Sequence, residues 1–448
     1  MAILEFARKA SFWMMDAWGG APVKTELSAL EEVNSSGPQE KNFENRKELV
    51  DLLKHAVKTT RFYSSFDSGS FFSFPVITKA TIKESYDNFV SDAFERDSLY
   101  EMTTSGSTGT PFTCLHDYGK KKSTYAEVLY YNGMIGYDIG RRIIYLRSVV
   151  EECSKTPLQQ FMQNIYLVDC HDLSDAGIES LLDRIRELST RNGAMLMGYA
   201  STLDAFRDYF RRKGVAKAEG VKLYGVASGS EMLFDDTREA IQQAFGCRCV
   251  SRYSNEENGF LAQDLFHNNE FVINKAHFIY EVLSMNSDEP AAEGEVGRIV
   301  ITDLRNYSMP MIRYDTGDVG RLVDLSTDKG ECYSAIVDFG GRRVDVIYDC
   351  YGNRISPHSV TNLMWRYTDV NQYQLVQKDE SSYLLKLNVP DAFSRDQELI
   401  ADLMKVLGGE SRLMIERVAD IPVLASRKRR YIVNECGMHR DDRSAEAQ

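Results

Sequence analysis

The stretch SDAGIESLLDRIRELSTRNGAMLMGYA, residues 174–200, contains one complete change from helix to strand. Ser174 can cap a helix whose apolar residues recur every three or four positions and which ends near Gly193. The apolar face of this helix consists of Ile178, Leu181, Leu182, Ile185 and Leu188. The run AMLMGYA that follows is short and apolar, which is typical of a buried strand. The stretch therefore predicts a helix followed by a strand in a covered sheet.

The same alternation continues toward the carboxyl end. Residues 203–213 predict a second helix that ends at Gly214, and residues 236–245 predict a third that ends at Gly246. Two further strands are expected at VKLYGVAS (221–228) and CRCVSRY (247–253). Helices and strands that alternate in this way indicate an α/β fold with a mostly parallel sheet covered by helices.

The pattern changes after Tyr253. FVINKAHFIYEVLS (271–284) and EVGRIVITDL (295–304) predict strands without long helices between them, which suggests a smaller barrel-like part. The last hundred or so residues predict a small α+β unit. Its elements are a hairpin in YQLVQKDESSYLLKLNV (373–389), a helix over 397–406 and a strand in RLMIERV (412–418). GGRRVD (340–345) is the expected boundary and hinge, so the predicted domains are 1–341 and 342–448.

Length and charge narrow the classes of function. A chain of 448 residues suggests two or three domains, and its 43% hydrophobic content is ordinary for a globular protein. A net charge of −13 argues against a general nucleic-acid-binding protein. The eight cysteines are scattered, and we find neither a signal peptide nor an apolar run of the ~18 residues that a membrane span needs. These features predict a reduced cytoplasmic protein without integral membrane association.

Residues 102–112, MTTSGSTGTPF, are rich in hydroxyls and glycine. The spacing of a Walker loop is missing. Such a run is either an ordinary surface loop or a loop that binds phosphate through backbone N–H groups and hydroxyls. Composition alone leaves both interpretations open.

Each of four other segments can be interpreted either as an ordinary turn or surface patch or as part of a ligand site. In YGVASGSE (224–231) a strand ends in a turn where backbone could approach a flat ligand. RYSNEENGF (252–260) offers a carboxylate that could hold Mg²⁺ or lie in a solvated acidic turn. MPMIRYDTGDVGRL (309–322) presents Asp318 to sugar hydroxyls or places it in a turn. ASRKRRYIV (425–433) is a basic patch unless Lys428 reaches an active site.

The order and spacing of these segments resemble one known family. Six motifs in sequence order are similar to those of the adenylate-forming acid ligases, most closely the phenylacetate–CoA ligase type and its capsular-polysaccharide-associated relatives. TSGSTGTPF resembles their phosphate loop, ASGSE their adenine turn, and YSNEENG the pattern Tyr-Gly-x-Ser/Thr-Glu. PMIRYDTGD resembles the ribose motif, GRRVD with GNRISP the hinge and the loop after it, and SRKRR the C-terminal Ser-Gly-Lys motif.

The resemblance implies an ATP-dependent ligase that forms an acyl-adenylate, releases pyrophosphate and then transfers the acyl group, most often to a thiol. Domain 1–341 would bind ATP and the acid, and 342–448 would be a mobile lid. The acceptor would be coenzyme A or a carrier-protein phosphopantetheine, with an amine or a protein cysteine as alternatives. Surface-polysaccharide or secondary metabolism is the implied setting, and a homodimer is left open.

The resemblance also implies roles for residues. The β- and γ-phosphates would be held by Thr104, Ser105, Gly106, Ser107, Thr108 and Gly109. Adenine and ribose would be bound by Ser228, Gly229, Ser230, Glu231, Tyr253, Asp318 and Arg342. Glu257 would coordinate Mg²⁺, and Lys428 would bridge the attacking carboxylate and the α-phosphate.

The chain departs from the family pattern at four positions. Thr110 stands where lysine is frequent, and Glu256 where a serine or threonine lies beside the α-phosphate. Val344 and Arg427 replace an aspartate of the hinge and a glycine of the C-terminal motif. Glu256 and Arg427 keep open an alternative of another class, a catalytically impaired nucleotide-binding protein of the same fold.

Overall fold

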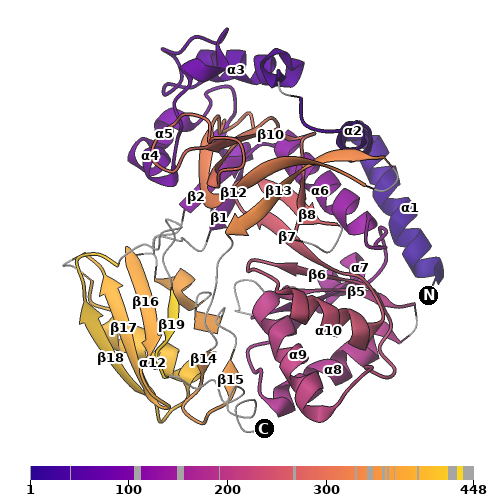
Figure 1. Ribbon diagram of the computed structural model, residues 1–448, viewed down its shortest axis with the longest axis vertical. Coiled ribbons are helices and arrows are strands. Elements are labelled where there is room, and N and C mark those ends of the chain that lie inside the picture. Colours follow the sequence, from indigo (N-terminus) through magenta and orange to yellow (C-terminus); the bar gives the residue numbers. More distant parts are fainter. Residues whose placement is uncertain are drawn as a thin grey trace.

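The computed structural model describes residues 2–436, apart from 41, 105–111, 149–155, 191, 266–268, 328–329, 341–346, 356–358, 361–362, 368, 391–392 and 422–430 (Figure 1). Its largest element is one sheet of eleven strands, in the order β10-β11-β12-β13-β9-β8-β7-β6-β5-β3-β4. The strands are β3 Ile143–Arg147, β4 Ile165–Asp169, β5 Ala194–Tyr199, β6 Leu223–Gly229, β7 Cys249–Asn255, β8 Gly259–Asp264, β9 Phe271–Ile273, β10 Phe278–Leu283, β11 Gly297–Asp303, β12 Tyr314–Ser326 and β13 Cys332–Gly340.

The half of this sheet from β4 to β7 is parallel and confirms the predicted alternation. The helices that cover it are α8 Asp175–Ser189, α9 Ala200–Lys213 and α10 Asp235–Phe245, side by side in Figure 1, with the short α7 Pro157–Gln163 before β4. Ser174 caps α8 by accepting a hydrogen bond from the backbone of Gly177. Gly214 and Gly246 end α9 and α10 in the left-handed conformation that glycine adopts without strain.

The half from β7 to β10 is antiparallel. These strands continue the parallel half as one mixed sheet, so the expectation of mostly parallel sheets beside a separate piece is correct for one half only. The run 271–284 also forms two strands rather than one, because a turn follows β9. Asn274 fixes this turn: its backbone N–H donates to Leu261 and its side chain donates to the carbonyl of Phe260.

The amino-terminal segments cover the antiparallel half. They comprise α3 Lys47–Thr59, α4 Lys79–Glu84, α5 Tyr86–Phe89, the hairpin of β1 Tyr100–Thr104 and β2 Phe112–His116, and the short 3₁₀ turns η1 Phe43–Asn45, η2 Phe71–Ser73 and η3 Arg96–Ser98. Their apolar residues share one core with β8 to β12, in which Leu52, Phe74 and Phe89 are fully buried. Burial of this kind is the main stabilising contribution to such a domain.

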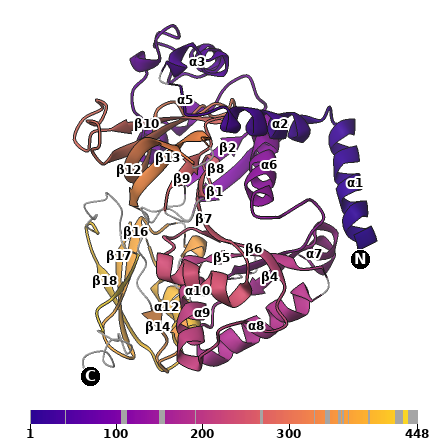
Figure 2. The same cartoon turned by 45° about the vertical axis from the view of Figure 1, so that its right-hand side comes forward.

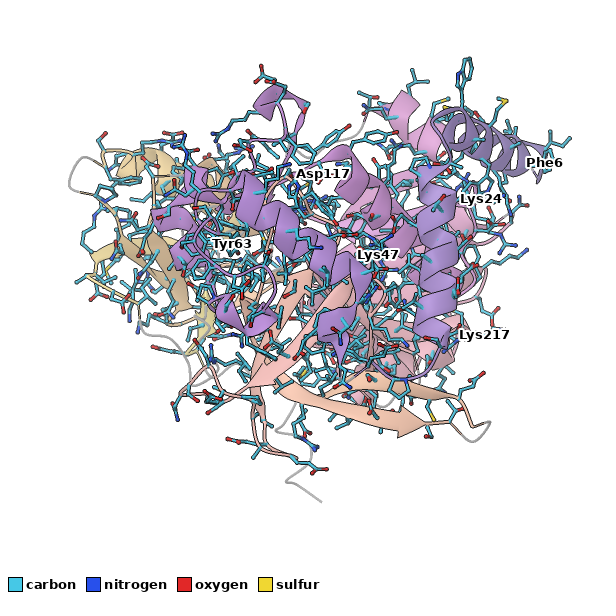
Figure 3. All side chains as sticks on the ribbon, turned by 90° about the horizontal axis from the view of Figure 1, so that it is seen from above. Phe6, Lys24, Lys47, Tyr63, Asp117 and Lys217 are labelled. Carbon is cyan, nitrogen blue, oxygen red and sulfur yellow. The ribbon has the colours of Figure 1, made fainter. Side chains whose placement is uncertain are left out.

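Helices α1 Ala2–Trp18, α2 Pro22–Ser35 and α6 Tyr118–Gly133 form a layer at one side of the molecule (Figure 2). Val23 and Leu30 of α2 pack against Ala126 of α6. Figure 3 shows Phe6 of α1 at the edge of the molecule, where its side chain is exposed. In the described part of the chain, no helix combines the length and the apolar character needed to cross a membrane.

The carboxyl-terminal unit has its own sheet, β18-β17-β16-β19, and its own core. Its elements are β14 Ile347–Tyr348, β15 Arg354–Ile355, η5 Met364–Arg366, β16 Gln372–Gln377, β17 Ser382–Asn388, α12 Asp396–Leu407, β18 Arg412–Arg417 and β19 Ile432–Asn434. The predicted hairpin, helix and strand at 412–418 are therefore confirmed as β16 with β17, α12 and β18. The expected boundary at 342 lies outside the described residues and stays a prediction.

Candidate active site

Tyr253 on β7 and Asp318 on β12, two of the residues predicted to bind adenine and ribose, contact each other. The hydroxyl of Tyr253 on β7 donates a hydrogen bond to Oδ2 of Asp318 on β12 at 3.0 Å. Both side chains are buried, and the Tyr253 ring lies 4.5 Å from the ring of Phe339. Burial raises the pKa of Tyr253. Because this hydroxyl keeps its proton, it can donate to Asp318 and fix the orientation of the carboxylate.

Glu257 lies in the turn between β7 and β8, and only 2% of the residue is exposed. Its Oε1 forms an ion pair with Nζ of Lys79 on α4 and accepts a hydrogen bond from the Tyr314 hydroxyl at 3.2 Å. Burial raises the pKa of Glu257, but the charge and hydrogen bond of Lys79, together with the hydrogen bonds from the Glu257 backbone and from Tyr314, outweigh it and hold the pKa below its ordinary value. Glu257 is therefore an ionised carboxylate at neutral pH.

The backbone of this turn is held by side chains from β2 and α6. Nε2 of His116 lies 2.8 Å from the carbonyl oxygen of Glu257, and Nζ of Lys120 donates to the carbonyl of Asn258. Lys120 also pairs with Asp303 at 2.7 Å, with both side chains fully buried. Burial, together with the charge of Lys120, lowers the pKa of His116 to about 4, so this ring is neutral. These contacts fix where the Glu257 carboxylate is presented.

Glu257 is an ionised carboxylate, the kind of group that binds Mg²⁺. Mg²⁺ in nucleotide sites commonly takes one or two carboxylates and completes its shell with phosphate oxygens and water. Lys79 and Tyr314 both contact Oε1 of Glu257, so Oε2 is the oxygen better placed for a cation. The described residues contain no group of three or more His, Cys, Asp or Glu that could hold a metal by themselves. A single ionised carboxylate such as Glu257 fits a cation whose other ligands are phosphate oxygens and water.

The turn after β6 has an unusual backbone. Ser230 adopts a φ of 70°, a left-handed conformation that non-glycine residues rarely take and that often occurs at ligand sites. Glu231 accepts a hydrogen bond from the backbone of Ser201 at 2.7 Å, in the first turn of α9. One oxygen of Glu231 therefore stabilises a helix start. The adenine-binding role of residues 228–231 stays a prediction.

Glu256, the departure from the family pattern, has a side chain that reaches solvent. Desolvation by the surrounding protein and the charge of Glu257 raise its pKa, while Arg147 and Lys121 oppose the shift. Arg147 and Lys121 thus offset part of the negative charge of Glu256. These two cations lessen the repulsion between Glu256 and the phosphates of a nucleotide.

Several predicted residues lie outside the part of the chain that the structure describes, namely Ser105, Gly106, Ser107, Thr108, Gly109, Arg342 and Lys428. Thr104 is described through its backbone alone, as the last residue of β1. Sequence reasoning missed Lys79, His116 and Lys120 because they lie in no motif. Tyr314 was inside the ribose-like motif, and its hydroxyl was the signal that could have found it.

Comparison with known proteins supports the resemblance on which these predictions rest. The family model "CapK C-terminal domain" matches residues 347–435. A phenylacetate–coenzyme A ligase of Thermus thermophilus is 28% identical over 232 residues, which are 49% of this chain and 51% of that protein. A phenylacetate–coenzyme A ligase of Pseudomonas putida is 28% identical over 119 residues, 26% of this chain and 27% of that protein. The chain thus matches about half the length of the Thermus protein and about a quarter of the length of the Pseudomonas protein.

Solved structures agree on the fold. 2-Hydroxyisobutyryl-CoA ligase in its postadenylation state aligns with a TM-score of 0.54 at 16% identity, covering 87% of this chain and 88% of that one. The same ligase with 2-HIB-AMP and CoA in the thioesterification state also gives a TM-score of 0.54 at 16% identity, covering 89% of this chain and 91% of that one. The chain therefore has the fold of this ligase, is homologous over about half of its length to a phenylacetate–coenzyme A ligase, and matches the CapK C-terminal domain over residues 347–435.

Proposed function

We propose that this protein uses ATP to convert a carboxylic acid into an acyl-adenylate, with release of pyrophosphate, and then transfers the acyl group to a thiol. The observation that carries the proposal is the meeting of Tyr253 and Asp318, with the ionised Glu257 four residues after Tyr253. Two segments from separate parts of the chain, 252–260 and 309–322, thereby present a polar ring, a cation-binding carboxylate and a sugar-binding carboxylate.

Each residue has a distinct task in this proposal. Asp318 accepts hydrogen bonds from the ribose hydroxyls, in an orientation set by Tyr253. Glu257 holds Mg²⁺, which when bound would offset the negative charge of the phosphates. Residues 104–109 bind the β- and γ-phosphates, and Arg342 joins Asp318 at the ribose. Lys428 brings a fixed positive charge to the attacking carboxylate and the α-phosphate, two anions that otherwise repel each other.

The acceptor is proposed from the relatives. The two curated relatives bear the name phenylacetate–coenzyme A ligase, and the structural neighbour has been solved with an acyl-AMP and CoA. Coenzyme A is therefore our first acceptor, followed by a carrier-protein phosphopantetheine. Transfer to an amine or a protein cysteine, and a setting in surface-polysaccharide or secondary metabolism, follow from the sequence resemblance alone.

A second candidate is a catalytically impaired nucleotide-binding protein of the same fold. Glu256 favours it, because a carboxylate replaces the hydroxyl expected beside the α-phosphate. The raised pKa of Glu256 and its two cationic neighbours count against it.

Exchange of labelled pyrophosphate into ATP separates the two candidates. A panel of carboxylic acids that includes phenylacetate is assayed with the wild type, Lys428→Ala and Asp318→Asn. We expect exchange with at least one acid, a loss of about 100-fold or more in Lys428→Ala, and a raised KM for ATP in Asp318→Asn. Lys405→Ala, an exposed position on α12, is the control and should behave as the wild type. Tight ATP binding without exchange for any acid would favour the impaired protein.

A further inference from the structure

Arg252 on β7 is partly exposed, but its Nε is buried, and its environment differs from those of the buried arginines. Its guanidinium donates to Oδ1 of Asn132, approaches Sδ of Met197 at 3.8 Å and lies over the ring of Phe260 at 5.2 Å. Its Nε is buried and has no hydrogen-bond partner. None of these neighbours is an anion, and burial lowers the pKa of Arg252 to about 10.

Three other arginines with little exposed surface show the usual solution. Arg238 pairs with Asp264, Arg298 pairs with Asp315 at 2.8 Å, and Arg313 pairs with Glu281 at 2.9 Å. Within the described ranges, no carboxylate lies at ion-pair distance from Arg252. A guanidinium removed from water without a counter-ion carries an uncompensated desolvation cost, which a bound anion would offset.

Arg252 lies on the face of the sheet that α8 to α10 do not cover. Strand alternation places Val250 and Arg252 on the same face of the sheet as Met197, Ala227 and Tyr145, the face opposite α8 to α10. Pairing of Tyr145 with Met197, of Met197 with Ala227 and of Ala227 with Val250 puts these residues in one row across the strands.

The two glycines of β6 on this face, Gly225 and Gly229, differ in how closely other atoms approach them. A Cβ on Gly225 would lie 2.5 Å from the carbonyl oxygen of Ile135, so this end of the face is packed. A Cβ on Gly229, closer to the carboxyl end, would meet no atom of the described residues within 4 Å. The carboxyl ends of parallel strands are where open α/β sheets bind ligands.

We propose that the acid activated by this protein carries a second anionic group, most simply a second carboxylate, and that Arg252 binds it. Asn132 holds one nitrogen of the guanidinium, which leaves other N–H donors for the paired oxygens of a carboxylate. Arg147 lies on the same face at the end of β3, over the Tyr145 ring, and adds a second positive charge. This inference rests on the proposed function and names its substrate class, a dicarboxylate or a similar doubly anionic acid.

The test compares acids that differ only in the second charge. Pyrophosphate exchange is measured with dicarboxylates from malonate to adipate and with 4-carboxyphenylacetate, each beside the ester that blocks its distal carboxylate. For at least one pair we expect kcat/KM to favour the diacid by roughly 30-fold, the range of a charge-assisted hydrogen-bonded pair. Arg252→Met should lose this preference and keep the kcat/KM of the ester within about threefold, while Arg252→Lys should keep part of it.

Two outcomes would overturn the inference: a wild type that does not favour any diacid, and an Arg252→Met variant that loses diacid and ester equally. The latter would assign Arg252 to the reacting carboxylate or to the fold. Stability gives a second readout, because an unpaired guanidinium should not stabilise the protein. Arg252→Met should therefore melt at or above the wild-type temperature, whereas Arg313→Met, which leaves Glu281 unpaired, should melt lower. Arg211→Met, an exposed residue on α9, is the neutral control.

Failure of the proposed function would look different. If no acid supports exchange, the same diacids are tested without ATP by thermal shift. A shift in the wild type that disappears in Arg252→Met would keep the anion site while refuting the ligase activity. No shift with any diacid would refute the site.

Discussion

At the scale of single residues, Glu257 shows how a carboxylate can be buried and remain charged. The motifs in the sequence predicted a role for Glu257, which lies four residues after Tyr253, and a role for Asp318. Lys79 could not, because its contact with Glu257 spans a long stretch of chain and depends on where α4 packs. The sequence thus predicted Glu257 and Asp318 as candidate ligand-binding carboxylates, whereas the ion pair of Glu257 with Lys79 needed the structure.

The ion pair between Lys79 and Glu257 leads to a prediction about pH. In the wild type, the pKa of Glu257 is below its ordinary value of 4.5, so this group contributes stability that is complete above that pH and is lost as the pH falls through the lowered pKa. Lys79→Met leaves a buried carboxylate unpaired, which should destabilise the protein by about 3 kcal/mol at neutral pH. In this variant burial dominates and raises the pKa of Glu257.

Thermal unfolding from pH 8 to pH 4 measures this effect. The difference between wild type and Lys79→Met should be largest at pH 7 to 8 and should shrink toward pH 4, because Glu257 takes up a proton in the variant while it stays largely ionised in the wild type. Lys83→Met, one turn further along α4, is the matched control and should show a small difference that does not depend on this carboxylate. A gap that stayed constant across the range would contradict the assignment.

At the scale of elements, local signals were sufficient where an element begins and ends through its own residues. Ser174, Gly214 and Gly246 mark helix ends through caps that act within a few residues, and all three were predicted. The order of the strands was not predictable in the same way. The pairing of β13 with β9 joins Ala335 to Val272, and nothing local to either strand specifies that partner. The sequence therefore predicted two separate groups of strands, whereas the structure joins them in one sheet.

Strand β6 offers a test of packing on a single face. Gly225 and Gly229 have the same orientation, but a methyl group at Gly225 would press on the backbone of Ile135 while one at Gly229 would have room. Gly225→Ala should lower stability by about 2 kcal/mol, the usual cost of overpacking. Gly229→Ala should cost less than half as much and should instead change the KM for the acid. Chemical denaturation and pyrophosphate exchange on both variants check this, and equal destabilisation would show that the space at Gly229 is filled in solution.

At the scale of the whole molecule, the chain divides into a large part built on the eleven-stranded sheet and a small part built on β16 to β19. Two contacts between them involve the described residues Ser148, Asp172, Ile355 and Ser359. Oγ of Ser148, just after β3, lies 3.1 Å from Oγ of Ser359, and an isolated bridge joins Asp172 to Ile355. An interface held by contacts of this kind suits a lid that changes position between two half-reactions.

A disulfide across this interface tests whether the lid moves. The two serine oxygens are close enough for Ser148→Cys with Ser359→Cys to form a bond without large backbone shifts. If adenylation and thioester formation need different positions of residues 342–448, the oxidised double variant should lose overall acyl-CoA formation by at least about tenfold. It should keep one half-reaction, measured as pyrophosphate exchange or as thioester formation from preformed acyl-adenylate, and dithiothreitol should restore turnover. Each single cysteine variant under the same oxidation controls for the native thiols. Full turnover in the cross-linked protein would mean that both half-reactions occur in the arrangement seen here, and that Lys428 reaches the α-phosphate without rotation of the lid.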